Sequence, residues 1–238
     1  MILVTNDDGN TEGLKILLET ANKFDEAYAI VPNKQRSAVS GALTLHKPIR
    51  LHKIDKNFYS INGTPADCVL FSLYSGEFTK PDLVLSGINW GDNTGLAALI
   101  GSGTIGACWQ AAIEGVPSIA FSMYRAKKHW KEKSEWGNKK QVEKRVEGII
   151  KELKPMLMPD KFFSVNLPDE LKSARIVFTN HMHQHRYKAN ITKRNDPNGH
   201  PYFWMTGGPA GVEKGSDYHE VAIRKNITIT EISMQAFR

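Results

Sequence analysis

Cysteine is scarce in this chain, and long hydrophobic runs are missing from it. Only two of the 238 residues are cysteines, Cys68 and Cys108, and each lies in an apolar stretch. Two cysteines cannot build a disulfide framework, so we expect two buried free thiols in a reducing compartment. The first residues do not form a signal peptide, and no apolar run approaches the length of a membrane span. These features predict a cytoplasmic protein that does not act in a membrane.

Several familiar catalytic and nucleotide-binding motifs are missing as well. Residues 101–104 (Gly-Ser-Gly-Thr) are not followed by the Gly-Lys-[Ser/Thr] of a Walker motif, and no G-x-G-x-x-G follows the first apolar stretch. There is no G-x-S-x-G nucleophile elbow and no catalytic Cys/His arrangement. The sequence therefore argues against a P-loop enzyme, a dinucleotide-binding enzyme and a serine or cysteine hydrolase.

The positive charge is confined to one segment. The formal net charge is +6 and the sequence isoelectric point is about 9.2, a balance that raises the question of nucleic-acid binding. Residues 124–155 hold eleven Lys or Arg against five Glu, so the rest of the chain is neutral. Because a solvated helix face usually explains such a segment, nucleic-acid binding is the minor interpretation.

Short apolar strands alternate with helical segments in the first half of the chain. The strand-like runs are residues 2–4, 27–31, 82–87 and 118–122. Asn10 is a candidate cap for a helix that follows the first run, and residues 104–114 are rich in helix formers. Short apolar strands between helices predict an α/β fold with a mostly parallel sheet covered on both faces.

The pattern changes in the second half. Apolar residues follow helical spacing over residues 142–153, and Pro155 and Pro159 close that helix. Strand-like pieces follow without intervening helices, which predicts hairpins, and the turn at residues 196–199 suggests a protruding arm. We therefore divide the chain into a core over residues 1–123 and a C-terminal, hairpin-rich extension over residues 124–238. The strand-like pieces are residues 163–165, 176–178, 202–204, 221–223 and 226–232.

Polar side chains follow three of the predicted strands, at the edge where open parallel sheets bind ligands. Asp7 and Asp8 follow the first strand, Ser37 comes after the second, and Asn89 comes after the strand at residues 82–87. Adjacent carboxylates repel each other and are costly to desolvate, and a bound cation removes that cost. Oxygen ligands suit Mg²⁺, Mn²⁺ or Ca²⁺, whereas structural zinc prefers Cys and His.

A plainer explanation exists for the two aspartates. In that explanation Asp7 or Asp8 simply caps the helix that follows, and Gly9 makes a turn. The dipeptide alone does not separate the two explanations. The presence of Ser37 and Asn89 on the same predicted edge favours the metal site.

A second candidate site precedes the helix predicted at residues 104–114. Small residues let backbone N–H groups approach an anion, and Ser102, Gly103 and Thr104 stand where the positive end of that helix would lie. A simple helix cap explains the same residues equally well. We interpret residues 63–67, with Pro65 suited to a first helical turn, as mainly structural.

Three other features favour packing or surface roles. His181, His183 and His185 alternate, but no carboxylate or cysteine adjoins them, so surface or partly packed histidines are the preferred interpretation. Asp217 is either a distant site residue or a turn former, and the turn is favoured. The five tryptophans show no regular spacing and are assigned to packing.

Taken in order along the chain, these motifs resemble those of the SurE family of stationary-phase survival proteins. The resemblance is dense over the first half and loose in the second, where residues 165–168 and 216–217 match. The matching runs of the first half are residues 2–9, 36–38 with 43–45, 63–68, 86–89 with Gly91, Asn93 and Gly95, and 102–104.

The resemblance implies a Rossmann-like core and a metal-dependent 5′- and 3′-nucleotidase, with activity toward short polyphosphate. It implies one divalent ion per subunit, Mg²⁺ or Mn²⁺ ahead of Ca²⁺, and dimers or tetramers formed by exchange of C-terminal elements. Trp90, Asp92 and Gly41 depart from the family pattern, which bears on substrate preference. Carried over by position, the metal ligands are Asp7, Asp8, Ser37 and Asn89.

We therefore expect a metal-activated water to attack the phosphate of a nucleoside monophosphate, with Asp7 or Asp8 accepting its proton. Three other roles stay open at the level of sequence. A covalent aspartyl-phosphate enzyme usually shows Asp-x-Asp, and a non-catalytic nucleotide sensor would bind nucleotide without turnover. A nucleic-acid-binding role would depend on the basic helix. The expected phosphate contacts are Ser102, Gly103 and Thr104, with Ser40 and Asn93 as secondary contacts.

Overall fold

The computed structural model describes residues 1–125, 136, 138–184 and 187–237, and its strands form two sheets. The larger sheet has nine strands, and the two remaining strands pair only with each other. The strands are β1 (Ile2–Thr5), β2 (Ala27–Pro32), β3 (Leu51–Asp55), β4 (Phe58–Ile61), β5 (Leu83–Trp90), β6 (Ser118–Met123), β7 (Lys161–Leu167), β8 (Ile176–Phe178), β9 (Tyr187–Asn195), β10 (Pro201–Pro209) and β11 (Ile227–Ser233).

The order of strands in the large sheet is β3-β4-β2-β1-β5-β6-β7-β11-β8. The strands from β4 through β7 pair in parallel, while β3 and β11 each run antiparallel to a neighbour. Strand β1 lies between β2, the next strand along the chain, and β5, which follows later in the chain. Because β1 is this switch point, the loops after β1, β2 and β5 meet at one edge of the sheet.

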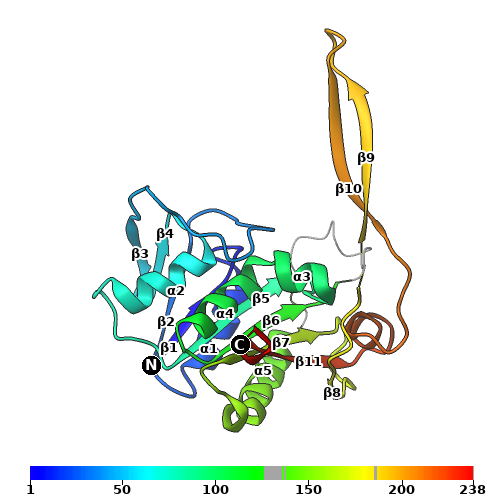
Figure 1. Cartoon of the computed structure of the whole chain (residues 1–238). Coiled ribbons are helices and arrows are strands. Elements are labelled where there is room, and N and C mark those ends of the chain that lie inside the picture. The colour runs from blue at the N-terminus through cyan, green and yellow to red at the C-terminus, as the bar shows by residue number, and fades with distance from the viewer. Residues whose placement is uncertain (126–135, 137, 185–186, 238) are drawn as a thin grey trace.

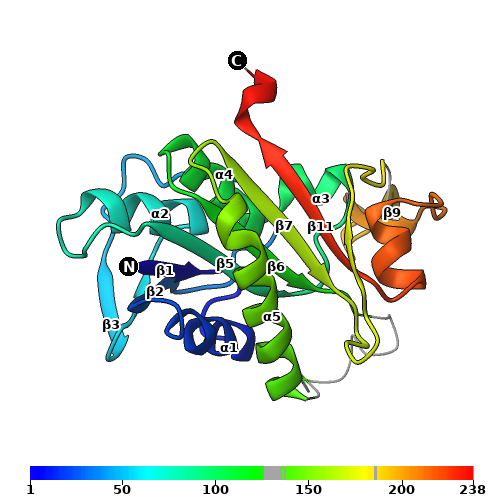
Figure 2. The same cartoon turned by 90° about the horizontal axis from the view of Figure 1, so that it is seen from below.

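Helices cover both faces of the large sheet, as Figure 2 shows from below. On one face, α1 and α5 bury their apolar sides against β1, β5, β6 and β7. On the other face, α2 and α4 pack against the sheet and against each other. The helices are α1 (Glu12–Ala21), α2 (Pro65–Tyr74), α3 (Gly95–Gly101), α4 (Gly103–Ile113) and α5 (Lys139–Leu153), with short helical turns η2 (Lys154–Met156), η3 (His219–Ile223) and η4 (Met234–Phe237).

No single described helix is long and apolar enough to cross a membrane. The pair α3 and α4 meets the length and composition requirements only when taken together, and these two helices are bent by 64° at their junction. Most of α4 is buried inside the fold.

Strands β9 and β10 form a long two-stranded arm that projects from the body of the molecule (Figure 1). Their antiparallel register runs from Tyr187 opposite Pro209 to Asn195 opposite Pro201. At the tip, the Asp196 carboxylate accepts hydrogen bonds from the backbone N–H groups of Asn198 and His200. The predicted arm and its turn are therefore confirmed.

The fold confirms the predicted α/β class, with a parallel core sheet, helices on both faces and a C-terminal hairpin. Strands β7, β8 and β11 come from the second segment of the chain, yet they complete the main sheet. Cys68 and Cys108 are free and buried, as expected. Burial raises the pKa of the Cys108 thiol to about 12.

Two local predictions are wrong. Residues 221–223 form part of the helical turn η3, because Ser216 accepts hydrogen bonds from the backbone N–H groups of His219 and Glu220 and starts a helix there. The first helix is capped by Thr11 and not by Asn10. The Thr11 hydroxyl accepts from the N–H of Leu14, so neither aspartate of the preceding loop serves as the cap.

Helix α1 approaches β5 so closely that Gly13 should not tolerate a side chain. A Cβ atom at Gly13 would lie 2.4 Å from the carbonyl oxygen of Ile88 and 2.6 Å from the ring of Trp136. We predict that Gly13→Ala lowers the free energy of unfolding by about 1–3 kcal/mol, the usual cost of overpacking. Urea unfolding measures this change.

Gly148 provides the matched control, because it lies in the middle of α5 and a Cβ atom added there would meet nothing within 4 Å. Gly148→Ala should stabilise the protein by about 0.5–1 kcal/mol through helix propensity. Equal effects of the two substitutions would show that the contact between α1 and β5 is not tight.

Candidate metal and phosphate site

The loops after β1, β2 and β5 enclose one pocket of about 380 Å³. All four residues predicted as metal ligands line it: Asp7 and Asp8 come from the loop after β1, Ser37 comes from the loop after β2, and Asn89 lies near the end of β5 itself. Two of the predicted phosphate contacts, Asn93 and Ser102, line it as well. The predicted ligands that the fold brings together are Asp7, Asp8, Ser37 and Asn89.

Hydrogen bonds of Asn6 fix the turn after β1 that carries Asp7. The Asn6 side chain accepts from the N–H of Gly9 and donates to the Gly9 carbonyl, which closes the turn. Gly9 has a φ of +78°, a conformation that favours glycine. The N–H of Arg36 donates to the Asp7 carbonyl at 2.7 Å, which joins this turn to the loop that carries Ser37.

The carboxylate of Asp7 is buried, with only 5% of the residue exposed. The Thr104 hydroxyl donates to its Oδ1 atom at 2.6 Å. Burial is the main reason that the pKa of Asp7 rises to about 6, and the neighbouring charge of Asp8 adds to the rise, while Thr104 opposes it. A charged Asp7 at neutral pH is therefore costly unless a cation lies beside it.

Asp8 is partly exposed and faces the same pocket. Its Oδ1 atom accepts a hydrogen bond from the Gln35 side chain at 3.1 Å. Burial raises the pKa of Asp8, and hydrogen bonds from Gln35 and the backbone of Trp90 counter the rise. Gln35 was not among the residues singled out from the sequence, although it stands two positions before Ser37.

Asn89 lies near the end of β5, and its side chain bonds to the backbone just after the strand. Its Nδ2 atom donates to the carbonyl of Gly91 at 2.7 Å, so this bond engages the amide nitrogen and not the carbonyl oxygen that a cation would need. The oxygen donors thus comprise two carboxylates, one amide and one hydroxyl, a set that suits a hard divalent cation. Within the described residues, no group of three or more His, Cys, Asp or Glu side chains lies close enough together to hold a metal ion.

Helix α4 begins directly against Asp7. Ser102 is its N-cap, and the Ser102 hydroxyl accepts from the N–H of Ile105. A Cβ atom at Gly103 would lie 2.9 Å from the Cβ of Asp7, so a glycine is needed for this approach. The positive end of α4 therefore adjoins the carboxylate pair, where it favours a bound anion.

The predicted phosphate contacts differ in their hydrogen-bond partners and in whether they line the pocket. Thr104 is engaged with Asp7, and the Ser40 hydroxyl donates to the carbonyl of Ile100 at 2.5 Å and lies outside the pocket lining. Asn93 is held by Ser122 and Asn166. Of this set, Ser102 and Asn93 are the side chains that face the pocket.

Other candidates from the sequence lie away from this pocket. Residues 63–67 start α2 with a capping box between Thr64 and Asp67, which confirms their structural role. His181 is exposed, His183 is buried, and His185 lies outside the described residues.

A larger groove of about 830 Å³ runs along α5, and it is lined by four Lys or Arg and a single carboxylate, Glu152.

A family model described as "Survival protein SurE" matches residues 2–189. The chain belongs to the SurE family. It is 38% identical to "5'-nucleotidase SurE" of Thermofilum pendens, over 98% of this chain and 90% of that protein. It is 34% identical to "5'-nucleotidase SurE" of Geotalea daltonii, over 98% and 92%.

The fold of this SurE-family chain also matches a solved structure. The crystal structure of the SurE protein from Aquifex aeolicus superposes with a TM-score of 0.79 at 30% sequence identity. The match covers 98% of this chain and 93% of that one. The sequence resemblance to the SurE family is therefore confirmed over nearly the whole chain.

Asp7→Asn should stabilise the metal-stripped SurE-family protein at neutral pH. The pKa of Asp7 is raised from 3.8 to about 6, so its charge destabilises the folded state at pH 7, by about 3 kcal/mol. Asparagine keeps an oxygen for the Thr104 hydroxyl and removes the charge. Thermal unfolding of the metal-stripped proteins should show a higher midpoint for the variant.

Excess Mn²⁺ should then raise the unfolding midpoint of the wild type and leave that of Asp7→Asn nearly unchanged, because binding to the folded state stabilises it. Asp55→Asn, at an exposed position of β3, is the control and should behave like the wild type. A lower midpoint for metal-stripped Asp7→Asn, or equal Mn²⁺ shifts, would contradict this explanation of the carboxylate pair.

Proposed function

We propose that this SurE-family chain is a divalent-metal-dependent phosphatase that hydrolyses nucleoside 5′-monophosphates. The observation that carries the proposal is the buried Asp7 carboxylate, which lies beside Asp8 in the pocket and against the first residues of α4. The relatives named "5'-nucleotidase SurE" support the choice of substrate class.

The metal-binding residues of the proposal are Asp7, Asp8, Ser37 and Asn89, holding one Mg²⁺ or Mn²⁺ ion per subunit. Support comes from the desolvation of Asp7, which a cation would relieve, and from the purely oxygen character of the four donors. When bound, a divalent ion would neutralise charge on the phosphate and lower the pKa of a water molecule.

The two aspartates have different surroundings and so different proposed roles. Asp7 is fixed by the Thr104 hydroxyl, which makes Thr104 a residue that orients a ligand. Asp8 is less buried than Asp7, so it is the better placed of the two to accept the proton of the attacking water. Gln35 keeps the Asp8 side chain turned toward the pocket.

The start of α4 is the proposed phosphate-holding element. Ser102 offers its side chain to the pocket, and Gly103 brings the backbone of the first turn close to Asp7. Asn93 also lines the pocket and is held by Ser122 and Asn166. Because these groups recognise a phosphate and not a base, we extend the proposal to 3′-monophosphates and to short polyphosphate.

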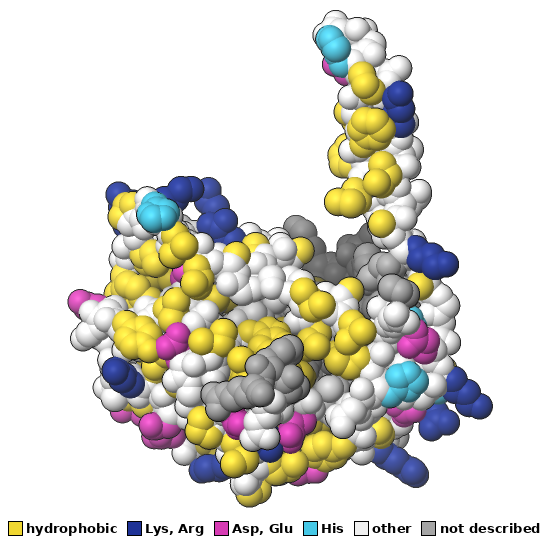
Figure 3. Space-filling view, in the orientation of Figure 1, with side chains coloured by type: hydrophobic (Ala, Val, Ile, Leu, Met, Phe, Trp, Pro, Cys, Tyr) yellow, Lys and Arg dark blue, Asp and Glu magenta, His cyan; other side chains and the backbone are white. Residues whose placement is uncertain are grey.

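The proposal also includes a homodimer or homotetramer that forms through the arm. Five large apolar side chains of the arm are at least 40% exposed. Figure 3 shows hydrophobic side chains, in yellow, on the surface of the arm. Exposed apolar surface of this kind marks an interaction site. The five residues are Ile191, Tyr202, Phe203, Trp204 and Met205.

Phosphate release from nucleoside monophosphates tests the enzymatic proposal. Wild-type protein should release phosphate with Mg²⁺ or Mn²⁺, lose this activity with a chelator and recover it when metal is added back. Asp8→Asn should lower the rate at least about 10²-fold, as expected when a charged group of a catalytic site is lost.

Asp55→Asn again serves as the control and should retain wild-type rates. Full turnover by chelator-treated protein, or a near wild-type rate for Asp8→Asn, would refute the assignment. Metal-dependent nucleotide binding without phosphate release would identify the chain as a non-catalytic nucleotide sensor instead.

Substituting the arm tests the oligomer. Phe203 and Met205 share one face of the arm with Ile191 through the strand register, so Phe203→Ser with Met205→Ser removes most of that apolar face. The molar mass measured by light scattering should fall, while Ile54→Ser at an exposed position of β3 should leave it unchanged. An unaltered mass in the arm variant would exclude this face as the subunit contact.

A further inference from the structure

Helix α3 forms one wall of the pocket, yet its own sequence does little to hold it there. It has seven residues, and its N-cap Thr94 makes no side-chain cap bond. Gly95 is its only buried residue, and Ile100 is 70% exposed. A helix of this length is not stable by itself. Since Ala97 and Ala98 line the pocket, whatever fixes α3 also shapes the pocket.

The first turn of α3 is capped from the far end of the chain. The N–H of Gly95 donates to Oδ2 of Asp217 at 2.7 Å, and the N–H of Leu96 donates to the carbonyl of His183 at 3.1 Å. These two groups satisfy N–H donors that a helix start leaves without intrahelical partners. The negative charge of Asp217 also suits the positive end of a helix.

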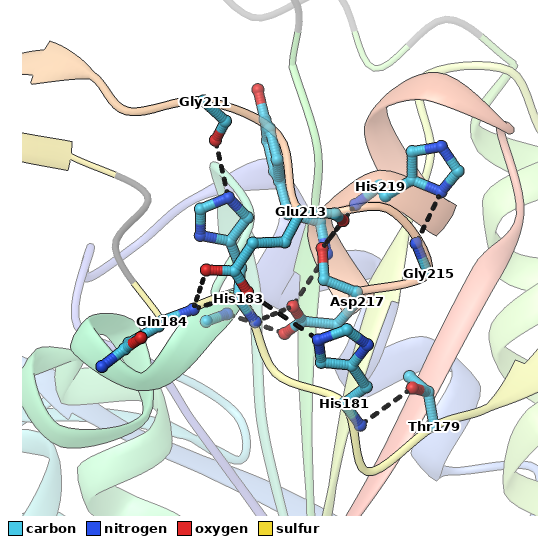
Figure 4. Close-up of polar contacts among 12 residues, drawn as sticks. Thr179, His181, His183, Gln184, Gly211, Glu213, Gly215, Asp217 and His219 are labelled. Carbon is cyan, nitrogen blue, oxygen red and sulfur yellow. Dashed lines mark hydrogen bonds and ion pairs between the residues drawn. The ribbon is translucent and has the colours of Figure 1, made fainter.

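Asp217 is itself firmly held, as the dashed contacts in Figure 4 show. Its Oδ1 atom accepts from the N–H groups of His183 and Tyr218, each at 2.8 Å, and its own N–H donates to the carbonyl of His181. Only 1% of Asp217 is exposed. Burial raises the pKa of Asp217, and the three backbone donors counter the rise.

The residues that hold α3 stand at the base of the arm. His183 lies shortly before β9, and its Nε2 atom makes a 2.7 Å contact with the carbonyl of Gly211, which lies just after β10. The Asp217 carboxylate therefore joins α3 to the segment before β9, and the His183 ring joins that segment to the one after β10.

The other end of α3 is tied to the loop that carries Ser37. The N–H of Ser40 donates to the carbonyl of Gly101 at 3.0 Å, and the Ser40 hydroxyl donates to the carbonyl of Ile100. Helix α3 is thus fixed by Asp217 at its start and by Ser40 at its end, while Leu99 in its middle packs against a core cluster and accepts a hydrogen bond from the Trp109 ring.

We propose that Asp217 is a positioning residue of the nucleotidase, which sets substrate affinity by capping α3 and so holding the pocket wall in place. The inference rests on the proposed function. Asp7 bonds to Thr104, Asp8 to Gln35 and the backbone of Trp90, and Asn89 to Gly91, and in the described contacts Asp217 bonds to none of these partners. Loss of Asp217 should therefore weaken substrate binding and leave the metal site and the reacting groups unchanged.

The test compares Asp217→Asn with Glu213→Gln. The asparagine keeps an oxygen for His183 and Tyr218 but places an N–H₂ group against the N–H of Gly95. Glu213 lies in the same segment and accepts from the N–H of Gln184, without a bond to α3 in the described contacts, so it is the matched control. Asp217→Asn should raise KM for a nucleoside monophosphate at least tenfold, with kcat and Mn²⁺ affinity changed less than twofold.

Hydrogen exchange gives a second measurement that does not depend on activity. Asp217→Asn should speed exchange of the Gly95 and Leu96 amides, whereas Glu213→Gln should not. Leu96→Pro removes a hydrogen bond of the same helix start, because proline lacks the N–H that donates to the His183 carbonyl. Proline is tolerated in a first helical turn. The variant should raise KM in the same way.

Unchanged amide exchange in Asp217→Asn, or faster exchange with an unchanged KM, would overturn the inference while wild-type turnover upholds the proposed function. A fall in kcat or Mn²⁺ affinity equal to the change in KM would assign Asp217 a general structural role instead. Absence of any wild-type turnover would refute the proposed function first, and with it the role of Asp217 in substrate affinity.

Discussion

The desolvated carboxylate of Asp7 is the feature on which the rest of the site depends. It lies between the turn after β1 and the first turn of α4, where Thr104 bonds it and Gly103 allows the close approach. Burial of a charge beside a second carboxylate is unfavourable without a compensating cation. A bound divalent ion would relieve this cost, and the proposed nucleotidase activity rests on that ion.

The order of the strands brings the four proposed metal ligands together at one edge of the sheet. With β2 and β5 on either side of β1, the loops that follow these three strands must share one edge. The helix that begins at that edge, α4, brings its positive end to the same place. The proposed metal site and the proposed phosphate site are therefore neighbours because of the order of the strands.

Local patterns in the sequence were sufficient for much of this. The apolar strands, their polar ends and the Gly-Ser-Gly-Thr run indicated the α/β fold and the carboxylate pocket, because each signal depends on adjacent residues. The strand predicted at residues 221–223 is wrong. The β-branched Val221 and Ile223 are typical of strands, but Ser216 starts a helical turn that includes them. The sequence does not predict helix α3, because a helix of seven residues with a glycine at each end carries almost no periodic signal.

Hydrogen bonds between residues far apart in the chain could not be predicted from the sequence. Asp217 was interpreted as a turn former, but it is a buried cap for a helix 122 residues away. Thr104 and Gln35 likewise acquire their roles from partners in the loop after β1. The residues next to each of these side chains in the sequence give no sign of its role, because its hydrogen-bond partner lies far away in the chain.

Anomalous diffraction from a crystal grown with Mn²⁺ tests the central claim most directly. We predict one strong anomalous peak per subunit, within coordination distance of oxygen atoms from Asp7, Asp8, Ser37 and Asn89. A fully occupied Mn²⁺ elsewhere in the subunit, with no peak between these four side chains, would contradict the account.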